Sequence, residues 1–532
     1  MKERIWSKDW FAALAFTVLF GVAYLFFYDT FQGLERYTYD LGVRARQRPP
    51  SDRIAVVAID DESIRNLGRW PWPRNLHAAM TDLLREGGAK VVGNTIFYFE
   101  AQEDPGLRYI REINQLVAQS PLAASPDADV HALMDALAAK LTEAQSTLSV
   151  DRLLAESMAK GPTRTVLGML FHLAPGVPAG RPDQPLPDHV RRNALTHVVD
   201  RVGARGNGWL PIQTEADVLV PLPELGQAVA ATGHMTETLD LDGAKRYEPL
   251  VLQHFDEYYP SLALMIAAQA LNLKPDDIEV RLGEGIALGG LQIPTTSDMR
   301  MYTHFYTDRD GHSPFPIDSF FDVFTGKIPP SSYKDKIVLI GATAPGVGNV
   351  FPTPVKSTMY PVESLAHSVS SILQQDFFTR PGWAGAAEPG LYVLIALYLA
   401  LVLPRLGPAL GAGVTGGLAA SLLITEVSLM AGSAAWLKLV SPVVLLVSGH
   451  LFMTIKRLRL TEILKASSES EGAESNRMLG LAFQGQGQLD MAFEKFRRVQ
   501  PVDDKVLDLM YNLALDFERK RQFNKAESVY QH

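Results

Sequence analysis

Acidic and amide side chains follow two runs of apolar residues that have the composition of buried strands. Asp60 closes the run IAVVAID and Asp61 follows it, and Asn94 lies within the run KVVGNTIF. Polar groups at the carboxyl ends of neighbouring parallel strands are typical of a pocket for a small ligand. Asp60 and Asp61 are adjacent, so on a strand their side chains point to opposite faces and make a poor acid/base pair. These positions predict ligand binding rather than a reaction.

A second polar group comes earlier in the chain, at Asp40, Arg44 and Arg46. We expect these side chains to face the strand ends and to complete a polar pocket. In the structural alternative, Asp61 or Ser63 caps the following helix and the arginines pair with the acids, which holds the sheet on a membrane stalk. The residue types favour this structural role over ligand contact.

Two tryptophans and an arginine form the third candidate group, in the segment LGRWPWPR at residues 67–74. Trp70 and Trp72 are able to grip a ligand by stacking, with Arg74 beside them. Proline on both sides of Trp72 fixes the backbone φ angle, which favours a rigid staple of this loop against the core.

Motifs for reactions, metals and cofactors are incomplete in this chain. Residues 341–347 follow a predicted strand, but Val347 stands where a phosphate-binding loop needs lysine. Residues 240–243 (DLDG) begin like a calcium loop yet lack the third acid and the distal glutamate, so an Asx turn is expected. There is no cysteine, and the 12 histidines show no paired metal-ligand spacing. We therefore expect no catalytic residue, no metal site and no cofactor.

Strand and helix patterns alternate through residues 29–383. Strands are predicted at residues 54–60, 90–97, 165–171 and 336–341, and helices at 75–86 and 362–374. A strand, helix and strand within about 30 residues imply a right-handed parallel crossover. Residues 105–160 are alanine-rich and helical with a break at 120–126, and residues 172–215 read as a long loop. The region is expected to be an α/β domain with a mainly parallel sheet.

Four apolar runs predict membrane-spanning helices. Residues 10–28 carry no charge over 19 positions, about 28 Å of helix, and three more runs cover residues 384–455. Basic residues precede the first run and follow the last, at Lys456, Arg457 and Arg459. Because basic flanks stay in the cytoplasm, residues 1–9 and both termini are predicted inside and residues 29–383 outside. Glu426 and His450 lie within these runs at different depths, which argues against a direct ion pair. An interfacial glutamate and an interhelical hydrogen bond are expected, and a proton relay or signalling contact is the alternative.

The chain ends in a predicted helical repeat. Residues 456–472 are expected to be a cytoplasmic helical linker with a flexible end at 467–472, followed by repeats at 473–532. The repeat rests on five positions matched 34 residues later: Leu479, Gly480, Phe483, Ala492 and Phe496 with Leu513, Ala514, Phe517, Ala526 and Tyr530. This is the tetratricopeptide period, and a plain pair of helical hairpins is the alternative. The second repeat is incomplete at His532, so we expect the sequence to be a fragment of a longer protein.

The ordered motifs of residues 30–380 resemble the second class of CHASE domains, the extracellular sensors of cyclases and of histidine and serine/threonine kinases. The resemblance rests on YDLGVRAR at 39–46, AIDDES at 58–63, LGRWPWPR, DLDG, YPSLA at 259–263 and IGATA at 340–344. It implies a sensor fold. Asn94 stands where the family carries aspartate, and Pro361 where glycine is usual before a valine–glutamate pair, so the family's ligand chemistry is not carried over. With its clustered helices and repeats, the whole chain resembles the N-terminal half of CHASE-bearing serine/threonine kinases.

These features favour a bacterial inner-membrane sensor that relays an outside signal to a cytoplasmic effector. The expected partners are an effector protein at the repeats, an unknown small extracytoplasmic ligand and membrane lipid, with a homodimer left open. The net charge of -9 argues against a nucleic-acid partner. The main alternative is an envelope assembly or scaffold protein that docks partners through its repeats.

Overall fold

The computed structural model describes residues 8–102, 104–124, 127–174, 185–308, 311–500 and 502–532. Its contacts group the chain into two compact units. The helical unit comprises Met1–Phe26, Pro389–Ala420 and Pro442–His532, and the α/β unit comprises Phe27–Glu388 and Ser421–Ser441. The α/β unit therefore includes a short segment, Ser421–Ser441, that the sequence assigns to the apolar runs.

A largely parallel sheet forms the centre of the α/β unit. Its strand order is β14-β1-β15-β2-β3-β5-β8-β9, with β6 also paired to β3. The pairs from β14 through β3 to β6 are parallel, whereas β5 and β9 run antiparallel to their neighbours β3 and β8. The strands are β1 (Ile54–Ile59), β2 (Val91–Asn94), β3 (Arg164–Leu173), β5 (Ile212–Leu219), β6 (Ala231–His234), β8 (Val251–His254), β9 (Glu257–Pro260), β14 (Ile317–Ser319) and β15 (Ile337–Ala342). The predicted α/β class and the mainly parallel sheet are confirmed.

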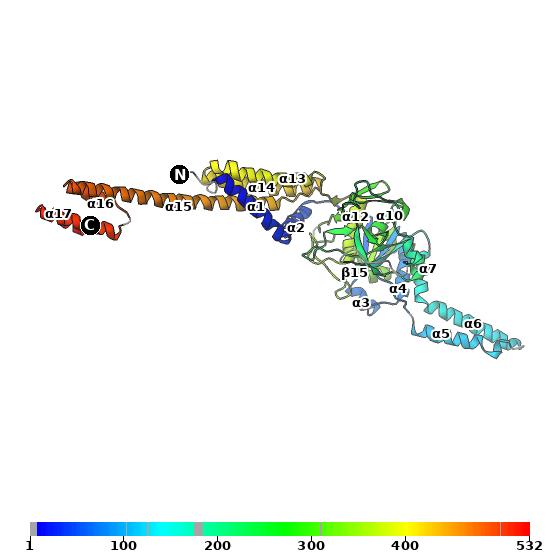
Figure 1. Ribbon diagram of the computed structural model, residues 1–532. Helices are drawn as coiled ribbons and strands as arrows, with labels where there is room; N and C mark the ends of the chain where they lie inside the picture. Colours follow the sequence, from blue (N-terminus) through cyan, green and yellow to red (C-terminus); the bar gives the residue numbers. More distant parts are fainter. Residues whose placement is uncertain (1–7, 103, 125–126, 175–184, 309–310, 501) are drawn as a thin grey trace. The chain divides into compact units, whose positions relative to one another are not determined.

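Continuous apolar runs produce these central strands because both sheet faces are covered. All six residues of β1 are buried, as parallel strands between two helix layers require. One face packs against α10 (Leu262–Ala270) and α12 (Pro361–Gln374), and the other against α3 (Asp61–Leu67), α4 (Arg74–Glu86) and α11 (Phe320–Phe324). Figure 1 shows α10 and α12 on one side of β15 and α3 and α4 on the other.

The remaining elements of the α/β unit are shorter or peripheral. The predicted helical stretch at 105–160 forms α5 (Pro105–Ala118), η2 (Pro121–Ala124), α6 (Ala128–Leu148) and α7 (Val150–Ala159), with the break where expected. Part of the predicted loop at 172–215 lies outside the described residues, and the rest contains short elements. Two small sheets and short helices complete the unit: β4 (Val198–Val199), β10 (Ile278–Arg281), β11 (Gly285–Leu288), β12 (Leu291–Pro294), β7 (Tyr247–Pro249), β13 (Arg300–Thr303), β16 (Phe377–Phe378), α8 (Asp188–Arg191), α9 (Pro223–Ala228), η3 (Pro275–Asp277) and η4 (Pro330–Tyr333).

Three helices among the described residues are long and apolar enough to cross a membrane. They are α1 (Asp9–Phe26), the stretch Ala384–Arg405 and α14 (Pro408–Ser433). The middle stretch begins as α13 (Ala384–Leu397) and continues through a π-helical turn, η5 (Tyr398–Val402), into η6 (Leu403–Arg405). The chain is therefore a multi-pass membrane protein.

Polar side chains connect the apolar helices inside the helical unit. The hydroxyls of Tyr398 and Thr415 lie 2.8 Å apart, and the Thr415 hydroxyl is 2.9 Å from Nδ1 of His450. Asp9 forms an ion pair of 2.8 Å with Lys456. These bonds satisfy groups that would otherwise be costly to bury among apolar helices.

The fourth predicted span, residues 439–455, is the start of α15 (Val440–Gly485). Its apolar part is short because Lys456, Arg457 and Arg459 follow, and the fourth crossing stays a prediction. The expected flexible end at 467–472 is wrong, since α15 runs through it as helix. One glycine and a few serines cost at most about 1 kcal/mol each in a helix, and the good helix formers around them outweigh that cost.

The described part of the C-terminal tail consists of helices joined by short non-helical segments. After α15 come α16 (Leu489–Phe496), α17 (Asp504–Arg519) and α18 (Phe523–Gln531). Ala492, Ala514 and Ala526 are buried between these helices, and Phe496 and Phe517 fill the space beside them. A side chain at Gly480 would meet the Phe496 ring, which explains the glycine at that position.

Candidate functional site

Helix α2 (Tyr28–Ala45) directly follows the first apolar helix and buries one face in the α/β unit. Its buried residues are Glu35, Tyr39, Gly42 and Val43, spaced as one side of a helix requires. The Tyr39 ring is fully buried, 5.0 Å from the ring of Trp436 and 5.5 Å from that of Phe378. This packing fixes which side chains of α2 point toward the rest of the unit.

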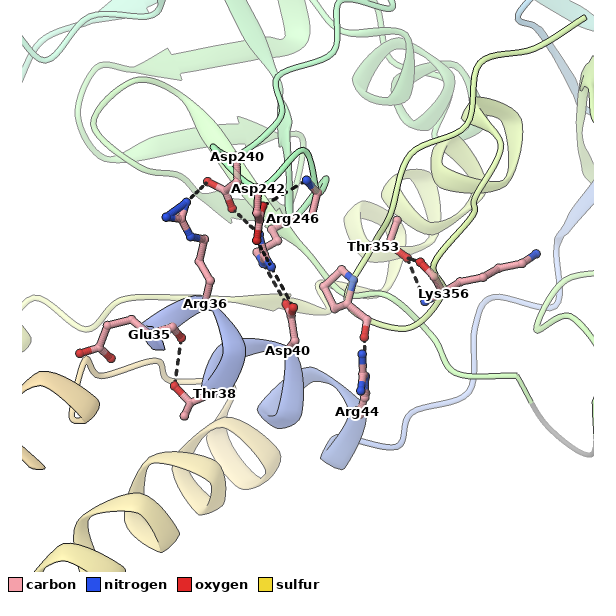
Figure 2. Close-up of polar contacts among 12 residues, drawn as sticks. Glu35, Arg36, Thr38, Asp40, Arg44, Asp240, Asp242, Arg246, Thr353 and Lys356 are labelled. Atoms are coloured by element: carbon pink, nitrogen blue, oxygen red, sulfur yellow. Dashed lines mark hydrogen bonds and ion pairs between the residues drawn. The ribbon is translucent and has the colours of Figure 1, made fainter. Parts of the chain in front are cut away.

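Asp40 of α2 binds Arg246, which lies at the centre of a cluster of three aspartates. The Arg246 guanidinium contacts both Asp40 oxygens at 2.8 Å, Asp240 at 2.8 Å and both Asp242 oxygens at 2.9 Å. Arg36 lies 3.9 Å from the other Asp240 oxygen. Figure 2 shows Asp40 and Arg36 reaching from α2 toward the loop that carries the other three side chains.

The Arg246 cluster is largely shielded from water. The Arg246 side chain is 5% exposed, against 18% for Asp40, 17% for Asp240 and 44% for Asp242. Burial by itself would lower the pKa of Arg246, but the three carboxylates outweigh it and raise that pKa. Burial likewise raises the pKa of Asp242, yet bonds from Arg246 and the Ala244 N–H leave it below its usual value. The pairing therefore favours the charged forms of Arg246 and Asp242.

Lys245, the neighbour of Arg246, forms a second buried ion-pair group. Its ammonium lies 2.5 Å from Glu237 and 2.8 Å from Glu248, and its side chain is 2% exposed. Burial opposes the charge, but the two carboxylates raise the pKa of Lys245. Glu248 also accepts a hydrogen bond from Ser368 of α12 at 3.1 Å. Residues 237–248 thus contact two helices: Arg246 binds α2, and Glu248 binds α12, which packs on the central sheet.

The same helix α2 also binds the ends of α14 and α15. Oε1 of Glu35 accepts bonds from the N–H and the hydroxyl of Ser441 at 2.8 and 2.7 Å, and Oε2 accepts from the Val440 N–H at 3.4 Å. An acid at this place satisfies the free N–H groups that begin α15. Burial raises the pKa of Glu35, although these bonds oppose the rise.

At the other end of α2, Arg46 binds the last carbonyls of α14. It donates to the Ala431 and Gly432 carbonyls at 3.1 and 3.3 Å and pairs with Asp376 at 3.4 Å. A cation at a helix C-terminus is favourable because the last carbonyl groups of the helix carry partial negative charge. Between the two ends, Thr38 donates to Glu426 of α14 at 2.8 Å.

Arg44 has a local role. Its Nε donates to the Pro354 carbonyl in the loop before α12, and Thr353 holds the turn by bonds to Lys356 (Figure 2). Arg46 therefore pairs with an acid that the sequence did not name, Asp376, whereas Arg44 binds a backbone carbonyl. No contact among the described residues joins Asp40, Arg44 or Arg46 to Asp60, Asp61 or Asn94.

Asp60 caps the helix that follows β1. Its Oδ1 accepts from the Ser63 N–H at 2.9 Å, the Ser63 hydroxyl at 2.5 Å and the Ser319 hydroxyl at 2.9 Å. Asp60 is thus the N-cap of α3, rather than Asp61 or Ser63, and it also ties β14 to β1. Asp61 is exposed in the first turn.

The tryptophan loop, Arg74 and Asn94 lie around the buried rings of Trp72 and Tyr98. Trp72 is 2% exposed and donates a hydrogen bond to the Gly68 carbonyl at 2.8 Å. Its ring lies 4.9 Å from the Phe320 ring and 5.3 Å from the Trp70 ring. Trp72 therefore anchors this loop to the core of the α/β unit, as the structural interpretation of the segment predicts.

Arg74 and Asn94 meet at Tyr98. Arg74 pairs with Asp151 and lies 5.2 Å over the Tyr98 ring, and Asn94 donates to the Tyr98 hydroxyl at 3.1 Å. The adjacent His77 is buried, which lowers its pKa to about 4, and its Nδ1 has no partner among the described residues. This cluster is filled by its own side chains.

Cavities in the described part of the α/β unit lie away from these residues. One of about 10 Å³ adjoins Lys356, Glu363 and His367, and one of about 1360 Å³ lies at the amino edge of the sheet. None of the nine candidate residues lines either of them. Within the described residues, no group of three or more histidine, aspartate or glutamate side chains is placed to hold a metal ion.

The sequence interpretation missed Arg246 and Lys245, the cations at the centre of both ion-pair groups. The signal was present: a basic pair stands three residues after the second aspartate of DLDG. The expected Asx turn does form there, since Oδ1 of Asp242 accepts from the Ala244 N–H at 3.1 Å, and the Gly243 N–H also donates to the Asp240 carbonyl at 2.8 Å. Its two aspartates, however, also bind Arg246, which no spacing rule for calcium or Asx turns indicates.

Comparison with known protein families gives one match, to the CHASE2 domain, over residues 14–404. This match covers well over half of the 532 residues. No curated protein and no solved structure matches the chain.

Proposed function

The chain belongs to the CHASE2 domain family, and from this premise we propose that it relays an extracytoplasmic signal through α2 to its membrane helices and on to a cytoplasmic effector. The α/β unit is the sensor, and the unknown ligand is a small molecule outside the cell. No reaction is assigned to this chain.

One observation carries the proposal: α2 makes charged contacts with the sensor and with two helix ends at once. Asp40 binds Arg246 in the α/β region, Glu35 binds the start of α15 and Arg46 binds the end of α14. A rigid helix held on both sides shifts as one body, so a change at residues 237–248 displaces the ends of α14 and α15.

The proposed location is the bacterial inner membrane, with both termini in the cytoplasm. Basic residues at the amino end and after the last apolar run support this orientation. A single cysteine placed at Arg69 or at Gly472 tests it, because the chain has no cysteine of its own. A membrane-impermeant maleimide on intact cells is expected to label Arg69→Cys and not Gly472→Cys, and the reverse labelling would refute the orientation.

The helical tail is proposed to be a tetratricopeptide-like surface for a partner, with a serine/threonine kinase domain as the expected effector. The buried alanines and phenylalanines of α16 to α18 support this reading. The alternative, a scaffold in which the tail docks partners without receiving a signal, differs in one respect only: it needs no communication from the sensor to the tail.

Hydrogen exchange of the full chain in lipid nanodiscs separates the relay from the scaffold. Asp40→Asn weakens the bond between α2 and Arg246, and its matched control is Asp61→Asn, which removes the same charge at an exposed site. A relay predicts faster exchange in 421–441 and an altered rate in the tail for Asp40→Asn alone.

Exchange that changes only in α2 and residues 237–248 would contradict the relay and favour the scaffold. Equal changes with Asp61→Asn would show that the effect comes from lost charge rather than from the contact.

A further inference from the structure

A basic residue stands directly before each of three neighbouring strands: Arg53 before β1, Lys336 before β15 and Lys90 before β2. The Ile337 N–H donates to the Arg53 carbonyl at 2.7 Å, and the Lys90 N–H donates to the Lys336 carbonyl at 2.8 Å. These bonds put the three residues side by side at the amino edge of the sheet. Neighbouring strands are about 4.8 Å apart, so three like charges repel one another there.

The cavity of about 1360 Å³ opens over this row. Two more cations line it, Arg164 at the start of β3 and Lys334 in the loop before β15. Its two carboxylates are Asp52 and Asp335, so five cations against two acids leave a net charge of +3. The whole chain has a net charge of -9, which makes this concentration of positive charge a local feature.

Four of these cations have no ion-pair or hydrogen-bond partner in the described part of the chain. Among the described residues, the side chains of Arg53, Lys90, Lys334 and Lys336 make no ion pair and no hydrogen bond, whereas Arg164 donates to the Gln269 carbonyl at 3.3 Å. Elsewhere in the same unit, buried cations such as Arg246 are paired with several acids.

Helix ends at the cavity do not balance this charge. The C-terminal ends of α10 and α12 line it, and the loop after α4 does as well. Each helix end carries roughly half a negative charge, so three of them supply about half of what the net +3 requires. The cavity keeps an excess of positive charge.

We propose that this cavity binds an anion with two or more phosphate or carboxylate groups, spread across the row of Arg53, Lys336 and Lys90. Such an anion relieves the repulsion within the row and is large enough to reach several cations at once. The site lies at the amino edge of the sheet, opposite the strand ends where the sequence predicts a pocket. Binding there does not depend on the relay through α2, because it is measured without any membrane response.

The test uses the full chain in nanodiscs of neutral lipid, with inorganic pyrophosphate and citrate as probes in calorimetry. The variant is Lys90→Gln with Lys336→Gln, and the matched control is Arg69→Gln with Arg205→Gln, two exposed cations outside the cavity. Nanodiscs containing cardiolipin form a second arm, since the two phosphates of its headgroup offer the same chemistry. If lipid is the source, cardiolipin weakens pyrophosphate binding; if a free anion is the source, it does not.

We expect the wild type and the control to bind a probe alike and the cavity variant to bind about tenfold more weakly. Without any probe, the cavity variant is expected to melt no lower than the wild type, because its like charges are relieved. Failure of the wild type to bind either probe, or equal binding by the cavity variant, would overturn the proposal. A cavity variant that melts well below the control without any probe would also overturn it, since the cations would then be holding the helix ends.

Discussion

Replacing Arg246 by methionine is the most direct perturbation of the joint between α2 and the α/β region. Methionine keeps much of the length and the apolar stem but removes the charge and all five hydrogen bonds to Asp40, Asp240 and Asp242. The three carboxylates then remain together without a guanidinium. Arg36 is 3.9 Å from Asp240 and compensates for only one of them.

The expected cost follows from burial. Removing one partner of a buried ion pair costs about 3–5 kcal/mol because the other charge is left unpaired. Asp40 and Asp240 are mostly buried, so this range applies to them, while Asp242 is 44% exposed and adds little. We expect a loss near 3 kcal/mol, which corresponds to a fall in melting temperature of roughly 6 °C at about 2 °C per kcal/mol.

Thermal unfolding of the full chain in detergent, followed by tryptophan fluorescence, measures this loss. Trp436 packs against Tyr39 of α2 and is one of the seven tryptophans that contribute to this signal. The control is Arg201→Met, which breaks an ion pair with Glu279 in which Arg201 is 57% exposed. That control is expected to cost less than about 1 kcal/mol.

A double variant tests the cause. Adding Asp40→Asn to Arg246→Met removes one unpaired charge, so the two changes together are expected to cost less than their sum, with a coupling of about 1–3 kcal/mol. The reasoning fails if Arg246→Met costs no more than the Arg201 control, or if the two changes are additive.

Three further outcomes follow from buried groups and close contacts. Acid should destabilise the α/β unit, because burial holds low the pKa values of its histidines, about 4 for His77 and His304 and about 3 for His234 and His367. The neutral histidines contribute their full stabilisation above pH ~6.5. Below that pH, the contribution of each histidine to the free energy of unfolding falls by up to about 1.4 kcal/mol per pH unit. A melting temperature that stays level from pH 7 to pH 5 would contradict this. Gly480→Leu should destabilise the tail by about 1–3 kcal/mol because a side chain there meets Phe496, whereas Gly472→Ala on the same helix should stabilise it; circular dichroism melts of both compare them, and equal melts would contradict the packing. Gly42→Cys with Met430→Cys should form a disulfide in this cysteine-free chain, since a Cβ at Gly42 lies 2.9 Å from that of Met430 and a separation of about 0.6 Å brings the pair to the ~3.5 Å of a short disulfide. A free-thiol assay that finds both cysteines reduced after oxidation would place α2 elsewhere.

The sequence by itself determined the features that repeat or that have a fixed length. Apolar runs such as that of β1 predict buried parallel strands because both faces need cover, and three of the apolar stretches have the length that a bilayer sets. The interruption between α5 and α6 and the turn at Asp240 were also visible, because proline, glycine and aspartate constrain the backbone locally. These signals act within a few residues, so no tertiary contact is needed to read them.

Only the tertiary structure decided which charges meet. Asp40 and Arg246 are about 200 positions apart in the chain, and Glu35 and Ser441 about 400, yet each pair is in direct contact. The sequence grouped Asp40 with Asp60 because both carry carboxylates near predicted elements, whereas the fold gives each its own partners. Ion pairing depends on distances of a few ångströms that long-range packing sets, and it leaves no period or spacing in the sequence.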